Sequence, residues 1–152
     1  MILQLKDPNL LKQHCYLNGK WREATSGLTL PVTNPATGET IACVPDMGSS
    51  ETEDTIVAAE QAFSLWKKTT VKARALLLRN WFNLILAHRT DLALLLTAEQ
   101  GKPLAEAEAE IIYGASYIEW YAEEAKRIYG DTIPPNNSDT RLFVLKEPIG
   151  VT

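Results

Sequence analysis

The strongest constraint on the fold is a long helical pattern in the last third of the chain. Its apolar residues recur every three or four positions, as on one face of a helix: Leu104, Ala107, Ile111, Ala115, Ile118, Ala122, Ala125 and Ile128. Pro103 can occupy the first turn of this helix, which we expect to run to about Tyr129 and to stop at Gly130. At 1.5 Å per residue its length is roughly 40 Å. A helix of that length must pack its apolar face against other elements.

Three further helices are expected before it, so that residues 49–129 are helical. Ser50 and Glu53 have the spacing of a capping box, and Thr70 and Thr90 are candidate caps for the second and third helices. Gly101 is expected to end the third. The predicted core faces are Ile56, Ala59, Phe63 and Trp66 in the first helix; Leu77, Leu78, Trp81, Leu84 and Ile85 in the second; and Leu92, Leu95 and Leu96 in the third.

The first 48 residues favour strands and turns. Asn18-Gly19 lies between short apolar runs and predicts a tight hairpin, because both residues accept positive φ. Residues 34–38 (NPATG) predict a turn between strands 30–33 and 40–44. Leu30, Val32, Ile41 and Cys43 occupy alternate positions, as the inward side chains of a half-buried ribbon do.

A strand pair is expected to close the chain, with residues 141–146 (RLFVLK) as one member after the turn-rich residues 134–139. Residues 149–152 (IGVT) resemble the opening of another strand, so we expect the chain to be truncated. The residues alone therefore indicate β-hairpins, then four helices, then a closing strand pair.

Length and charge exclude several classes of protein. With 152 residues the chain has the length of one ordinary domain, and its formal net charge of −4 argues against a nucleic-acid surface. The N-terminal stretch is broken by Lys6, Asp7 and Pro8, which excludes a secretory leader. The longest strongly apolar stretch, residues 92–96, falls far short of a membrane span of about 20 residues. A cytoplasmic location is expected.

Candidate reactive residues are few. Cys15 and Cys43 are predicted to be buried, inert thiols. Cys15 and His14 are rejected as a catalytic pair, because adjacent residues on a strand point to opposite faces. No two glycines have the G-x-G spacing of a dinucleotide or phosphate loop. Two histidines, His14 and His88, offer little for a metal site.

The remaining polar and aromatic features have structural interpretations. His88 is expected to close the second helix, where a histidine suits the helix dipole. Glu106 and Glu110 share one helix face and are interpreted as a solvated N-terminal face in preference to an acid–base pair. Trp66, Trp81 and Trp120 are interpreted as core residues in preference to an aromatic ligand cage.

Several motifs resemble the aldehyde dehydrogenase superfamily. The most specific is EQGKPLAEA at residues 99–107, while YIEWYAEEAKRIYGDTIP at residues 117–134 resembles the bacterial succinate-semialdehyde dehydrogenases in particular. YLNGKW at residues 16–21, TNPATGE at residues 33–39 and KEPIGVT at residues 146–152 agree with it and follow in the family's order.

The resemblance implies an α/β fold of the aldehyde dehydrogenase kind, of which this chain is the N-terminal part. Residues 1–48 would form an N-terminal β-ribbon segment, and residues 49–134 the helical part of the cofactor-binding domain. Residues 135–148 would supply a strand of the oligomerisation arm, and residues 149–152 the start of the dinucleotide-binding sheet. Family members form homodimers or homotetramers.

The resemblance implies that this chain contains no catalytic, cofactor-binding or metal-binding residue of the family. In the family a cysteine thiolate attacks the aldehyde, and a backbone N–H and an asparagine hold the oxyanion. Hydride passes to NADP or NAD, and a glutamate activates water. That asparagine lies in a Pro-Trp-Asn segment shortly after the position of Thr152, and the other groups come later. Neither cysteine here matches the nucleophile's motif.

Three functional hypotheses follow. The first is an NAD(P)-dependent succinate-semialdehyde dehydrogenase of 4-aminobutyrate breakdown, of which this piece alone is inactive. The second keeps the enzyme and changes the aldehyde, for example to glutarate semialdehyde. The third is a non-catalytic interaction module that acts through its β-ribbon and helix faces.

Overall fold

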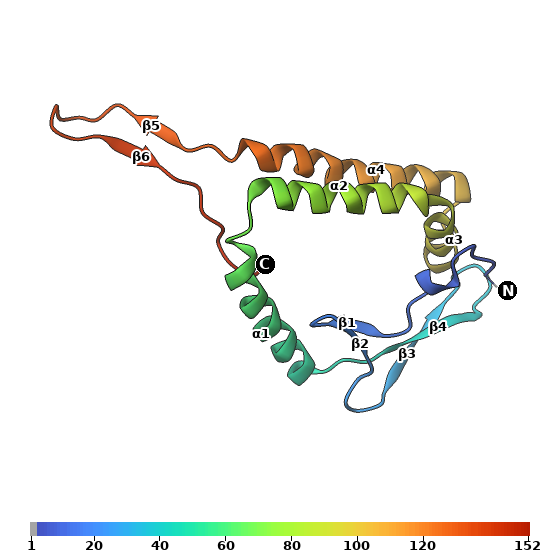
Figure 1. Cartoon of the computed structure of the whole chain (residues 1–152). Helices are drawn as coiled ribbons and strands as arrows, with labels where there is room; N and C mark the ends of the chain where they lie inside the picture. The colour runs from blue at the N-terminus through green and yellow to red at the C-terminus, as the bar shows by residue number, and fades with distance from the viewer. Residues whose placement is uncertain (1–2) are drawn as a thin grey trace.

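The computed structural model describes residues 3–152, in which three antiparallel strand pairs and four α-helices follow one another (Figure 1). The elements are η1 (Pro8–Leu10), β1 (Cys15–Leu17), β2 (Lys20–Arg22), β3 (Thr29–Thr33), β4 (Thr40–Pro45), α1 (Ser49–Trp66), α2 (Val71–Ala87), α3 (Arg89–Gln100), α4 (Leu104–Glu124), η2 (Ala125–Arg127), β5 (Asp131–Ile133) and β6 (Leu142–Val144). This order confirms the expected sequence of hairpins, four helices and a closing strand pair.

The first hairpin forms as predicted around Asn18-Gly19. Asn18 has φ 48° and Gly19 has φ 79°, which is the left-handed pair that a two-residue turn of this kind requires. The turn sets the register of β1 on β2, with Tyr16 opposite Trp21 and their rings 5.2 Å apart, edge to face. Local chemistry alone explains this element.

The second hairpin also forms, but its inward face differs from the prediction. Asn34 organises the turn, since its Oδ1 accepts the N–H of Ala36 at 2.9 Å and its carbonyl accepts the N–H of Gly38 at 2.7 Å. An irregularity in the register between Val32 and Thr33 leaves an extra residue on β4. The bulge breaks the alternation, so that Ala42 is buried and Cys43 is exposed. The prediction of a buried Cys43 was therefore wrong.

The first turn of α1 is held by Glu51, two residues before the glutamate of the predicted capping box. Gly48 is the N-cap residue, and its N–H donates to Glu51 Oε2 at 3.0 Å. The other carboxylate oxygen of Glu51 accepts the N–H of Thr25 at 2.9 Å. The box at Ser50 and Glu53 was wrong, because a contact with the loop after β2 decides which glutamate caps the helix.

The boundaries of α2 and α3 follow the prediction in part. Thr70 caps α2 as predicted, with its Oγ1 accepting the N–H of Ala73 at 3.3 Å. His88 closes α2 and is also the N-cap residue of α3, so the predicted cap at Thr90 was wrong. Gly101 ends α3 with φ 78°, as expected for a C-terminal glycine.

Helix α4 is shorter than its apolar pattern. Pro103 precedes the helix as its N-cap residue, and the α-helical part ends at Glu124 before the 3-10 turn η2. Its 21 residues correspond to roughly 31 Å. The prediction that it runs to about Tyr129 was wrong, because the last turn tightens into a 3-10 turn, as helix ends often do.

The core of the helical part is built from alanine. Helices α2 and α4 lie side by side, and α3 packs at one end of α4 (Figure 1). The buried hydrophobic residues of these three helices are Ala75, Ala93, Ala98, Ala107, Ala115 and Ala122. Small side chains let two helix backbones approach closely, which leaves larger side chains at the flanks of the contact.

Several predicted core residues are therefore exposed. In the part of the chain that the structure describes, Ile56, Trp66, Leu77, Trp81, Leu84, Leu104, Trp120 and Ile128 each expose between 41% and 65% of their surface. Their helical spacing was right, but no element of residues 3–152 covers that side of the helices. The interpretation of Trp66, Trp81 and Trp120 as core residues was wrong.

The last strand pair extends away from the helices as a thin arm (Figure 1). Strands β5 and β6 pair antiparallel, with Thr132 opposite Phe143. The predicted strand at residues 141–146 is shorter than expected, and residues 149–152 form no strand. Among residues 3–152, no helix combines the length and apolar character needed to cross a bilayer.

Candidate functional site

The two cysteines and His14 lie on or beside the two N-terminal hairpins. Cys15 on β1 is half-buried and Cys43 on β4 is exposed. His14 Nε2 lies 3.7 Å from Glu23 Oε1 across the first hairpin, an exposed contact. Within the described residues, no group of three or more His, Cys, Asp or Glu side chains is placed to hold a metal ion.

The carboxylates at the start of α4 have a basic neighbour. Lys102 donates from Nζ to Glu110 Oε2, and this hydrogen bond raises the pKa of Lys102. Glu106 is exposed and acts on Lys102 only through its charge. Glu110 is thus an ion-pair partner at the first turns of α4, which agrees with a structural role.

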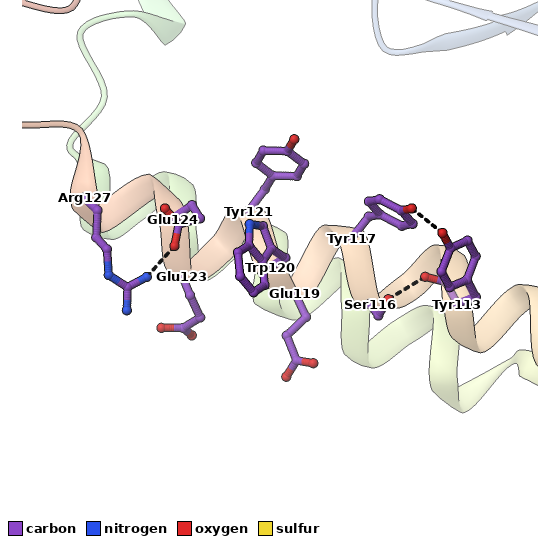
Figure 2. A pocket seen from close by; sticks show the side chains of 9 residues that line it. All are labelled: Tyr113, Ser116, Tyr117, Glu119, Trp120, Tyr121, Glu123, Glu124 and Arg127. Carbon is purple, nitrogen blue, oxygen red and sulfur yellow. Dashed lines mark hydrogen bonds and ion pairs between the residues drawn. The ribbon is translucent and has the colours of Figure 1, made fainter.

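An open hollow of the described surface follows the aromatic face of α4 (Figure 2). It has a volume of about 730 Å³ and is lined by Tyr113, Ser116, Tyr117, Glu119, Trp120, Tyr121, Glu123, Glu124 and Arg127. Positions 113, 117, 120 and 124 share one side of a helix. Trp120 is 65% exposed. The signal for this face is the spacing of its aromatic residues, which we did not separate from the apolar stripe.

Two tyrosines of this face are paired. Their hydroxyl groups share a hydrogen bond, and the rings of Tyr113 and Tyr117 meet edge to face with centroids 5.0 Å apart. The hydrogen bond with Tyr113 raises the pKa of Tyr117 above its usual value. A protonated phenol donates a hydrogen bond and is a poor nucleophile.

Two glutamates that line the hollow, Glu119 and Glu123, belong to an ion-pair cluster that fastens α2 to α4. Arg79 of α2 donates from Nη1 to Glu119 at 2.5 Å and from Nη2 to Glu123 at 2.6 Å. These bonds raise the pKa of Arg79. The pKa of Glu123 is lowered by Lys126, 3.0 Å away, and by Arg79. Sequence analysis missed this cluster, because Arg79 lies 40 residues before its partner Glu119.

This surface offers groups for stacking and for hydrogen bonding. Aromatic faces stack on planar or apolar groups, and the tyrosine hydroxyls and Ser116 offer hydrogen bonds. Ser116 donates its own hydroxyl to the carbonyl of Tyr113 at 2.6 Å. No residue lining the hollow combines a nucleophile with a neighbouring base, as covalent catalysis requires.

Comparison with known proteins identifies the family. The model of the aldehyde dehydrogenase family matches residues 21–152 of the chain. The chain belongs to the aldehyde dehydrogenase family. The match covers the ribbon β3–β4, all four helices and the β5–β6 arm, so the α/β assignment of the aldehyde dehydrogenase kind is confirmed.

Curated relatives match almost the whole chain. A glutarate-semialdehyde dehydrogenase of Pseudomonas putida is 57% identical over 150 residues, and a 3-sulfolactaldehyde dehydrogenase of Pseudomonas putida is 57% identical over 151 residues. The NADP+ succinate-semialdehyde dehydrogenase of Escherichia coli K12 is 55% identical over 150 residues. Each match covers 99% of this chain and 31% of the relative, so the chain spans about a third of its relatives' length.

A solved structure shows the same fold. The crystal structure of a succinate-semialdehyde dehydrogenase from Burkholderia pseudomallei superposes with a TM-score of 0.94 at 53% identity. The superposition covers 96% of this chain and 30% of that structure. The arrangement of ribbon, helices and arm in this aldehyde dehydrogenase chain is therefore that of the matching part of a larger molecule.

Proposed function

We propose that this chain is the N-terminal part of an NAD(P)-dependent dehydrogenase that oxidises succinate semialdehyde to succinate, as in 4-aminobutyrate degradation. The observation that carries the proposal is the 55% identity, over 99% of the chain, with the Escherichia coli enzyme of that activity. Membership of the aldehyde dehydrogenase family supports the reaction class. The family motif at residues 99–107 joins the end of α3 to the start of α4, and the motif at residues 117–134 runs from α4 through η2 and β5.

The cofactor is proposed to bind outside these residues. No glycine pair with G-x-G spacing exists to hold a pyrophosphate. The basic residue that lines the hollow on α4, Arg127, already pairs with Glu124 at 2.7 Å, and Glu119 and Glu123 pair with Arg79. A phosphate in this hollow would have to compete with these ion pairs. We therefore propose that the residues that bind NADP or NAD lie beyond Thr152.

The same reasoning applies to the catalytic groups. We propose no catalytic residue within residues 1–152, because neither Cys15 nor Cys43 lies in the motif of the family's nucleophile. The proposed role of this part is architectural: residues 1–48 as a β-ribbon segment, 49–134 as helices of the cofactor-binding domain, 135–148 as a strand of an oligomerisation arm, and 149–152 as the start of the dinucleotide-binding sheet. We propose a cytoplasmic homodimer or homotetramer.

A second candidate substrate has its own observation. The glutarate-semialdehyde dehydrogenase of Pseudomonas putida is 57% identical to this chain, and the succinate-semialdehyde enzyme is 55% identical. Succinate semialdehyde and glutarate semialdehyde each carry an aldehyde and a carboxylate. We therefore propose a small anionic aldehyde as the substrate class, with succinate semialdehyde first and glutarate semialdehyde second.

Reading the coding DNA beyond codon 152 is the first test. We expect an in-frame continuation that contains a Pro-Trp-Asn segment and a later cysteine. Expression of that longer product should give NADP+ or NAD+ reduction with succinate semialdehyde, measured at 340 nm. The ratio of kcat/KM for succinate and glutarate semialdehyde then decides the substrate.

The 152-residue chain is the matched control and is expected to reduce neither cofactor. Reduction by this chain alone would contradict the proposal that its residues are architectural. A stop codon directly after codon 152 would contradict the enzymatic proposal and leave a non-catalytic interaction module as the explanation.

A further inference from the structure

Asp91, in the first turn of α3, is bound to a segment that lies far away in the sequence. The Asp91 side chain accepts the N–H of Lys6 on Oδ1 at 3.1 Å and the N–H of Asp7 on Oδ2 at 2.9 Å. These residues precede Asp91 by 85 and 84 positions. Asp91 is 3% exposed and is the buried charged residue of the described chain. Hydrogen bonds from Asp7 and then Lys6 lower its pKa.

A carboxylate at this position usually serves its own helix. An acidic residue in the first turn commonly accepts backbone N–H groups that the helix leaves unpaired. His88, the N-cap residue of α3, makes no side-chain cap bond either. Both oxygens of Asp91 leave the helix and bind the N-terminal segment. The start of α3 therefore binds the N-terminal segment through the side chain of Asp91.

The N-terminal segment has the matching shape because of its own residues. Successive N–H groups of an extended chain point in opposite directions, so two of them reach one carboxylate only where the chain bends. A bend is present at Lys6 and Asp7. Asp7 Oδ1 accepts the backbone N–H and the side-chain amide of Asn9, each at 3.0 Å. Pro8 restricts Asp7 to its extended backbone, with φ −114° and ψ 97°.

The N-terminal segment holds much of this shape through its own contacts. The bonds from Asn9 to Asp7 and the 3-10 turn η1 involve no residue outside positions 7–11. Docking on Asp91 therefore does not have to create the bend, which reduces the entropy lost when the two parts meet.

The N-terminal segment also lies between the β3–β4 ribbon and α3. Leu3 lines a narrow hollow together with Asn34 and Ile41 of the β3–β4 ribbon and Ala98 of α3. No residue from 3 to 11 is buried, whereas Ala93 and Ala107 of the neighbouring helices are 0% exposed. The segment thus joins ribbon and helices through few buried contacts, a pattern typical of regions that open locally.

We infer that residues 3–11 form a latch that docks on Asp91 and opens as a unit while α2, α3 and α4 stay packed. The docked latch adds a link between the β3–β4 ribbon and α3, beside the close approach of Pro35 to Gly101 at the end of α3. The inference concerns how the layers are joined and does not depend on which aldehyde the larger protein oxidises.

Asp91→Asn is the sharpest variant. Asparagine has nearly the same shape, but its side-chain oxygen can accept one N–H, and its NH2 group faces the other N–H, a donor opposite a donor. Asp54→Asn is the matched control, because Asp54 is an exposed aspartate on α1. Hydrogen–deuterium exchange of the whole 152-residue chain, followed by mass spectrometry of its peptides, reads the latch and the helices separately.

We expect exchange of the latch peptide to be about 10–100-fold faster in Asp91→Asn, as the loss of two charge-assisted hydrogen bonds predicts. Peptides of α2 and α4 should exchange as in the wild type, and Asp54→Asn should leave the latch unchanged. Unchanged exchange of the latch in Asp91→Asn would overturn the inference.

A measurement on the wild-type chain guards against a variant that does not fold. Exchange is followed at increasing sub-denaturing urea concentrations, where a local opening exposes little surface and depends weakly on urea. We expect a smaller urea dependence for the latch than for α2 and α4. Equal dependence would mean that the latch opens only when the whole chain unfolds, and the inference would be wrong.

Discussion

Helices α1 and α4 are both long and amphipathic, yet they differ in what their apolar faces contact. Helix α4 has 21 residues and buries Ala107, Ala115 and Ala122 against α2 and α3. Helix α1 has 18 residues and buries none. Its Leu65 is 74% exposed. The amphipathic pattern is therefore sufficient to make each helix, but a partner element is needed to make a core.

The difference also shows which residues carry the packing. In α4 the buried positions are alanines at spacings of eight and seven residues, which lie on one helix face. Its larger apolar residues, such as Leu104, lie at the flank and are 41% exposed. Close helix–helix contact depends here on small side chains at the buried positions. A larger side chain should therefore destabilise the fold at a buried position of α4 and have little effect on α1.

The largest effect is expected from adding volume at Ala115, which is 1% exposed. Ala115→Leu should lower the free energy of unfolding by about 1–3 kcal/mol, because the larger side chain forces α4 away from its neighbours. Ala62→Leu, the same change at an exposed position of α1, should alter it by less than about 0.5 kcal/mol. Urea unfolding followed by circular dichroism measures both, and equal losses would refute the comparison.

A smaller effect is expected from the ion-pair cluster between α2 and α4. Arg79→Met removes the bonds to Glu119 and Glu123 and should lower Tm by less than Ala115→Leu does, because the cluster is partly exposed. Arg79→Lys should lower Tm by less than Arg79→Met does, since a lysine keeps the positive charge and loses only the planar fork of the guanidinium. Thermal scans in low salt and in 1 M NaCl measure the Tm of each protein. A Tm difference between the wild type and Arg79→Met that grows with salt would exclude an ionic origin.

The start of α1 should respond to acid. Hydrogen bonds, first those from Thr25 and also one from the Ser50 side chain, lower the pKa of Glu51 from 4.5 to about 2. A depressed pKa in the folded state stabilises the fold above pH 4.5, and this stabilisation is lost as the pH falls from about 4.5 towards 2.

Glu51→Gln should therefore be less stable than the wild type at pH 6, with the gap closing towards pH 2. Exchange rates of α1 amides across this pH range make the measurement. Glu53→Gln, at an exposed position two residues further along, is the control and should follow the wild type. A constant gap at every pH would show that the charge of Glu51 is not the cause.

The smallest effect is expected on the open face of α1. Leu65→Ser should change the free energy of unfolding of the chain by no more than about 0.5 kcal/mol, because the side chain is already 74% exposed. Chemical denaturation measures the change. A loss of 2 kcal/mol or more would reveal that Leu65 packs against another part of the molecule.

Local signals were predicted well and non-local ones were not. Asn18-Gly19, Thr70 and Gly101 were assigned correctly, since each acts on residues within one turn of itself. The cap at Glu51 was missed, because its second partner, Thr25, lies 26 residues earlier. The resemblance to the aldehyde dehydrogenase family was confirmed, whereas the aromatic hollow on α4 was not recognised as a surface.

The sequence by itself determined where the chain turns and where it forms helices, because turn chemistry and helical periodicity are properties of neighbouring residues. It also carried the motifs that place the chain in its family. Only the tertiary structure decided which side of each helix is buried, that a bulge exposes Cys43, and that Asp91 holds the backbone of Lys6 and Asp7. Burial and long-range hydrogen bonds depend on residues that meet only when the chain folds, and the spacing of residues along one element does not contain that information.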